Sequence, residues 1–183
     1  MTWYDNIWVL AAAFLAVFWE AAFPGMHYLL GAQLDLLPAL MVYASLRGSF
    51  STVCLLACFG GLWFDSLSAN PLGISILPLL IVGLAIYTRR GVILRDQPFA
   101  QAVLGFIASL VAPVLTLILL LTTGHTPRLG WGTLWQLFVV AGAGTLAAPI
   151  FFLLFDWLKH TFSHKRVLET SFRSDREIRR GRL

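Results

Sequence analysis

The sequence predicts an all-α integral membrane protein folded as a bundle of six transmembrane helices. Of its 183 residues, 58% are hydrophobic and 12% are charged, whereas about a quarter of the residues in a soluble domain are charged. The uncharged stretches 66–88, 97–127 and 129–155 each exceed the roughly 20 residues that cross a bilayer. This composition excludes a soluble globular protein, a disordered chain, a secreted disulfide scaffold and a nucleic-acid-binding module.

The six expected spans follow one another with short connections, at 6–24, 34–47, 49–66, 72–89, 98–122 and 134–158. No Lys or Arg precedes the first apolar run, so we interpret it as an uncleaved helix and not as a signal peptide. The second span is the weakest prediction because it is short and carries Pro38. The fifth span is the strongest, and Pro113 in its middle predicts a kink.

The basic residues predict the orientation of the bundle. An even number of spans puts both termini on one side, and cytoplasmic termini place Arg47, the 89–95 connector and the C-terminal tail inside. Twelve of the 13 Lys and Arg residues are then cytoplasmic and only Arg128 is outside, as the positive-inside rule requires. We therefore expect a membrane domain at 1–158 and a basic cytoplasmic tail at 159–183, which either contacts anionic lipid or docks a cytoplasmic partner.

Three carboxylates, Glu20, Asp35 and Asp65, fall at the outer ends of the first three expected spans. An ionisable residue inside a membrane span usually indicates a function. This inference is weaker near the membrane interface, where Asp35 could instead cap a helix. The alternative is an outer pocket for a small ligand, formed by Asp35, Asp65 and Arg128.

Asp65 continues a stripe of small residues along one helix face, through Gly61, then Cys58 or Ala57, and then Cys54. Small residues let membrane helices approach closely, so we expect Asp65 to face a neighbouring helix or a cavity. It either caps the hairpin between spans three and four or contacts a partner or ligand. A second small-residue patch, at 141–149, predicts another close helix contact, inside the fold or against a partner.

No motif indicates an enzyme. The sequence lacks G-x-S-x-G, H-E-x-x-H and a P-loop, and His160 and His164 have only Glu169 nearby as a further metal ligand. We therefore expect a non-catalytic protein without a cofactor or metal.

One region resembles a known family. Leu37-Pro38-Ala39-Leu40 opens the second span, Gly61-Leu62-Trp63-Phe64-Asp65 closes the third, and Pro71-Leu72-Gly73 opens the fourth. A Gly-Leu-x-x-Asp motif, a short polar turn and a Pro-Leu-Gly motif resemble the rod shape-determining protein MreD family over residues 37–77. Ala39 departs from the family pattern, in which Asp or Asn is frequent at this position.

The resemblance implies a multi-pass subunit of the bacterial inner membrane that scaffolds or regulates peptidoglycan synthesis during cell elongation. It implies as partners MreC, a RodA-type glycosyltransferase with its transpeptidase, and the MreB cytoskeleton, and it marks Pro38, Gly61, Asp65, Pro71 and Gly73 as helix-packing or partner residues. The family's fold is similar to that of the vitamin-binding subunits of energy-coupling-factor transporters, which supplies the alternative function.

Overall fold

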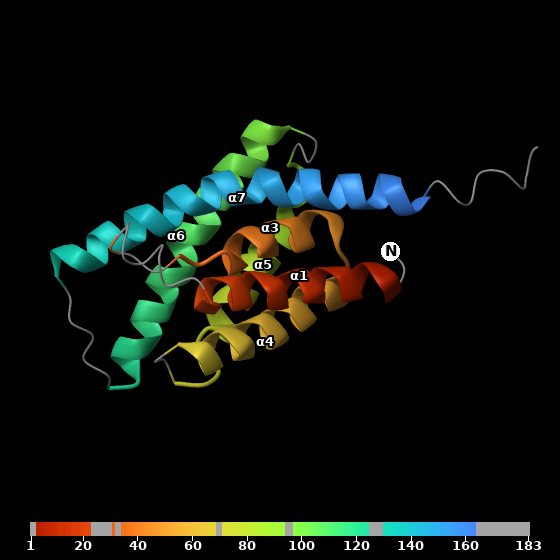
Figure 1. The fold of residues 1–183 in the computed structure, drawn as a ribbon. Coiled ribbons are helices and arrows are strands. Elements are labelled where there is room, and N and C mark those ends of the chain that lie inside the picture. The colour runs from red at the N-terminus through yellow and green to blue at the C-terminus, as the bar shows by residue number, and fades with distance from the viewer. Residues whose placement is uncertain are drawn as a thin grey trace, which may run out of the picture. The chain divides into compact units, whose positions relative to one another are not determined.

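Helices are the only regular secondary structure in the described part of the chain. The computed structural model describes residues 3–22, 31, 34–68, 71–93, 97–124 and 130–163. They form α1 (Trp3–Ala22), α3 (Leu37–Arg47), α4 (Phe50–Leu67), α5 (Ile76–Arg89), α6 (Pro98–Thr122) and α7 (Trp131–Ser163) (Figure 1). The chain divides into two compact units, Met1–Phe152 and Leu153–Leu183, so α7 contributes residues to both.

The all-helical fold class is confirmed, whereas the number of spans remains a prediction. Helices α4, α6 and α7 are long and apolar enough to cross a membrane, and α1 and α5 contain shorter apolar stretches. With 11 residues, α3 is only about 16 Å long, which is about half of a bilayer's hydrocarbon core. The predicted fifth span, 98–122, coincides with α6, which continues through Pro113.

The first unit is organised around α3. Every residue from 37 to 46 is buried, and the helix packs against α1, α4, α5 and α6, as its central place in Figure 1 shows. Pro38 lies in the first turn of α3, where a proline costs no helical hydrogen bond. Tyr43 packs edge-to-face on Phe152, with ring centroids 5.0 Å apart.

One end of this unit holds the basic connectors. Between α3 and α4, Ser49 and Thr52 form a reciprocal capping box, and Thr52 Oγ1 donates to Asn6 Oδ1 of α1 at 2.6 Å. Arg90, which follows α5, donates to the carbonyl of Gly48 at 3.1 Å and lies over the ring of Tyr87. The connectors after α3 and after α5 therefore lie at the same end.

Helices α6 and α7 make a backbone-to-backbone contact away from their connecting loop. A Cβ atom added to Gly105 would overlap the carbonyl oxygen of Gly144 and the side chain of Ala148. A Cβ atom on Gly144 would in turn overlap Ser109. The 141–149 patch is therefore used inside the fold, which is one of the two expected alternatives.

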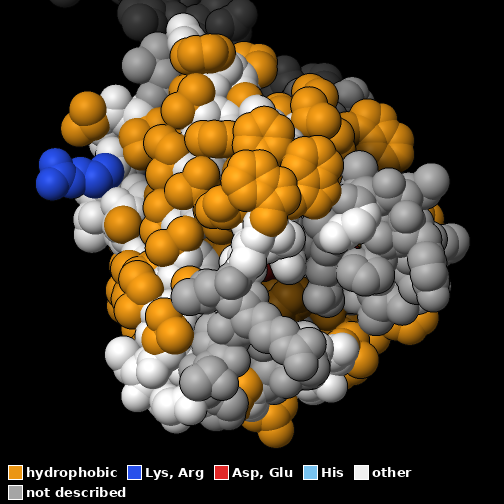
Figure 2. Space-filling model, turned by 90° about the vertical axis from the view of Figure 1, so that its left-hand side faces the viewer, with side chains coloured by type: hydrophobic (Ala, Val, Ile, Leu, Met, Phe, Trp, Pro, Cys, Tyr) orange, Lys and Arg blue, Asp and Glu red, His pale blue; other side chains and the backbone are white. Residues whose placement is uncertain are grey.

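Large apolar side chains cover much of the described part of the face shown in Figure 2. On α7 alone, Trp131, Phe138 and Leu146 are 85%, 70% and 69% exposed. Because water solvates such surface poorly, this distribution suits contact with lipid or with other membrane helices.

Most of the expected cytoplasmic tail lies outside the described residues, since α7 ends at Ser163. Residues 165–183 contain no apolar run, so we expect a chain truncated before residue 165 to keep its fold. It should elute from a sizing column as one monodisperse species with an unchanged unfolding temperature. Aggregation of the truncated chain would show that the tail packs on the membrane domain.

Candidate functional site

Asp65 closes the hairpin between α4 and α5. Its side chain is 1% exposed, and its carboxylate accepts three hydrogen bonds, from the backbone N–H of Gly73 at 2.8 Å, from that of Ser75 at 3.1 Å and from the Ser75 hydroxyl at 2.5 Å. The predicted cap network is therefore present. We call Asp65, Gly73 and Ser75 the Asp65 clasp.

The other motif residues of this hairpin shape the same turn. Gly73 has φ +92°, which a glycine adopts without strain, and Pro71 accepts a hydrogen bond from Ile74 N. A Cβ atom on Gly61 would lie 3.0 Å from the backbone of Ile76, so glycine is needed where α4 meets the start of α5. Gly61, Asp65, Pro71 and Gly73 thus act together, whereas Pro38 lies separately at the start of α3.

The small-residue stripe below Asp65 is only partly buried. Gly61 and Ala57 are buried, but Cys54 is half-buried and Cys58 is exposed. The buried face therefore passes through Ala57, because the inward face of α4 is set by its contacts with α1 and α5.

Two further carboxylates lie near the clasp. Glu20 Oε1 accepts a hydrogen bond from Leu36 N at 2.7 Å and ties the end of α1 to the start of α3. Asp35 Oδ1 accepts from Leu37 N at 3.0 Å, so it caps the first turn of α3, as expected, although the N-cap position itself is Leu36. Asp35 is close enough to interact electrostatically with both Glu20 and Asp65.

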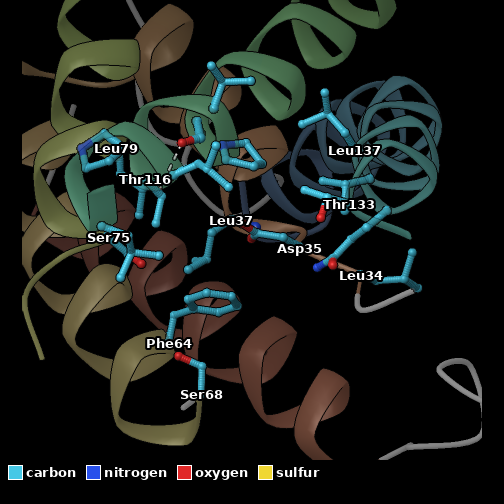
Figure 3. Close-up of a pocket in the computed structure, with 18 of the residues that line it drawn as sticks. Leu34, Asp35, Leu37, Phe64, Ser68, Ser75, Leu79, Thr116, Thr133 and Leu137 are labelled. Atoms are coloured by element: carbon cyan, nitrogen blue, oxygen red, sulfur yellow. Dashed lines mark hydrogen bonds between the residues drawn. The ribbon is translucent and has the colours of Figure 1, made fainter. Parts of the chain in front are cut away.

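A cavity of about 680 Å³ opens beside these carboxylates. Its walls come from the segment before α3, the end of α4, the start of α5, the second half of α6 and the first part of α7. In Figure 3, Asp35 lies between Ser75 and Thr116 on one side and Thr133 and Leu137 on the other. Most lining residues are apolar, among them Leu37, Phe64, Leu79, Leu117, Leu120 and Leu137.

The cavity follows from the way α6 and α7 pack. The two helices touch at Gly105 and Gly144, yet the cavity is lined by Ala112 to Leu120 of α6 and by α7 only as far as Val140. The helices therefore separate toward their connecting loop. Pro113 lies at the start of the α6 wall.

Of the residues predicted to form an outer pocket, Asp35 lines the cavity, whereas Asp65 does not; its hydrogen-bond partner Ser75 does. Arg128 lies outside the described residues. Thr116, Thr133 and Gln136 also line the cavity and were not predicted from the sequence; their signal was a polar side chain within an otherwise apolar helix.

The described residues contain no group of three His, Cys, Asp or Glu side chains placed to hold a metal ion. The carboxylates at this end are instead engaged with backbone N–H groups. These carboxylates can form hydrogen bonds and electrostatic interactions, and they lie next to an apolar cavity.

The chain was compared with protein families, with curated proteins and with solved structures, and nothing in any of the three matches it.

Proposed function

We propose that this protein is a non-catalytic, multi-pass subunit of the bacterial inner membrane that belongs to the MreD family and scaffolds or regulates the cell-wall elongation complex. The observation that carries the proposal is the Asp65 clasp. Four of the five motif residues, Gly61, Asp65, Pro71 and Gly73, meet in one hairpin. The Asp65 carboxylate accepts hydrogen bonds from three donors of that hairpin. A carboxylate engaged in this way stabilises the hairpin, which is compatible with a non-catalytic subunit.

The proposal includes a six-span bundle with both termini in the cytoplasm. In this arrangement the end with Gly48 and Arg90 faces the cytoplasm, and the Asp65 clasp faces outward. The large exposed apolar side chains of α7 would be available to lipid and to the transmembrane helices of partners. MreC, a RodA-type glycosyltransferase with its transpeptidase, and the MreB cytoskeleton are the proposed partners.

Purification of the tagged native protein in mild detergent, with mass spectrometry of the proteins that accompany it, tests this proposal. We expect MreC and the elongation synthases to be recovered, and an irrelevant six-span protein with the same tag should not recover them. Recovery of a pair of ATPases with a coupling membrane subunit would contradict the scaffold role.

That second result would support the alternative function, a small-molecule-binding subunit of an energy-coupling-factor type transporter. The cavity favours this candidate, because its volume of about 680 Å³ is within the range of small-molecule pockets, roughly 300–1,000 Å³. A vitamin or similar molecule that stays bound through purification, and that mass spectrometry identifies, would establish it.

A further inference from the structure

We infer that the cavity beside Asp35 binds a small amphiphilic molecule with an apolar body and a protonated amine as its head. This inference deepens the second candidate function by naming the class of ligand. It does not require a transporter, because a scaffold subunit could hold the same molecule.

The size of the cavity favours a small molecule. The cavity volume of about 680 Å³ is within the roughly 300–1,000 Å³ range of small-molecule pockets. The opening is therefore suited to a chain or ring system.

The walls select for an apolar body. Apolar residues make up most of the lining, among them leucines of α5, α6 and α7 and the ring of Phe64 (Figure 3). Burial of apolar surface against such walls contributes about 25 cal/mol per Å², so an alkyl chain or a ring would supply most of the affinity.

The charge of the lining selects the head. Among the described residues that line the cavity, Asp35 is the only one with an ionisable side chain, and none is Lys or Arg. A carboxylate removed from bulk water is stabilised by a cation or a strong hydrogen-bond donor.

The hydroxyl groups favour the same head. The Ser75 hydroxyl already donates to Asp65 Oδ1, and the Thr116 hydroxyl donates to the carbonyl of Ala112 at 3.0 Å. Since each hydroxyl has one hydrogen, their oxygens can only accept further hydrogen bonds. These two hydroxyl oxygens can accept from the N–H groups of an ammonium head, while the Gln136 amide, which also lines the cavity, can both donate and accept.

A pair of photoreactive probes tests the inference on the full chain in nanodiscs of neutral lipid. The probes are hexadecylamine and hexadecanoic acid carrying the same diazirine, and mass spectrometry locates the labelled residues. We expect the amine to label the cavity walls of α6 and α7 about tenfold more than the acid does, which corresponds to one charge-assisted hydrogen bond.

Two variants assign the labelling to the site. Asp35→Asn keeps an oxygen that can accept from Leu37 N, so the cap survives, and it should reduce amine labelling about tenfold. Leu117→Trp puts a bulky indole into the cavity wall and should remove most of the labelling, whereas Ile118→Trp, on the exposed side of α6, should leave it unchanged.

The outcomes separate the ligand class from the proposed functions. Equal labelling by both probes, unaffected by Asp35→Asn but lost in Leu117→Trp, would overturn the amine head while leaving a small-molecule cavity. Labelling that Leu117→Trp does not change would overturn the site altogether. Neither result depends on which proteins accompany the chain in purification, so the scaffold proposal is tested separately.

Discussion

Replacing Gly105 with leucine should prevent α6 and α7 from packing and unfold much of the membrane domain. A Cβ atom alone would overlap the backbone oxygen of Gly144 and the side chain of Ala148, and leucine adds three further carbon atoms. Overpacking a core with extra methylene groups costs about 1–3 kcal/mol. Since a backbone atom cannot move aside as a side chain can, we expect a loss of more than about 3 kcal/mol. Thermal unfolding in detergent, followed by tryptophan fluorescence and size exclusion, measures it.

Gly142 provides the matched control on the other helix. Nothing lies within 4 Å of a Cβ atom built there, so Gly142→Leu should not lower the unfolding free energy, and because glycine is a poor helix former it should raise it by up to about 1 kcal/mol. A Gly105→Leu chain as stable as Gly142→Leu would mean that α6 and α7 do not touch at Gly105 and Gly144. The cavity that opens where the two helices separate would then lose its structural basis.

This contact shows how far the sequence could predict the packing. The 141–149 patch indicates that a close approach occurs, because small residues occur where helices meet in membranes. It does not indicate which of several small residues faces the neighbour, since Gly142 and Gly144 are equally small and differ only in their angle around the helix. That angle is set by the tertiary contact with Gly105 and Ser109.

Helix positions were more predictable than the cavity, for a physical reason. The expected span 49–66 differs from α4 by only one residue at each end. The agreement is close because a run of apolar residues and the Ser49 cap set the bounds of a helix through local interactions. The second span was expected at 34–47, but α3 begins at Leu37, after Asp35 has capped it. The cavity depends instead on the separation of α6 from α7, which no local pattern encodes, and only its carboxylate, Asp35, was identified.

Replacing Asp65 with alanine should destabilise the α4–α5 hairpin by about 3 kcal/mol or more. The change leaves the N–H groups of Gly73 and Ser75 without the carboxylate that accepts from them, and hydrogen bonds to a charged group contribute about 1.5–3 kcal/mol. For a chain of this length, 3 kcal/mol corresponds to a fall in Tm of about 6–12 °C. Asp65→Asn, which keeps one acceptor oxygen, should lose about half as much. Thermal unfolding of the detergent-purified variants measures both.

The control for Asp65 lies on the next residue of the same helix. Ser66 is exposed and its hydroxyl donates only to the carbonyl of Trp63 one turn earlier, so Ser66→Ala should leave the Tm within about 2 °C of the original value. A variant that unfolds also loses its binding partners, so co-purification of the Asp65 variants is informative only at a temperature where they remain folded.

If Asp65→Asn is folded and still recovers every partner, the carboxylate acts inside the hairpin alone. If Asp65→Ala unfolds at the same temperature as Ser66→Ala, the clasp does not stabilise the hairpin, and a direct contact between Asp65 and a partner becomes the better explanation of the motif.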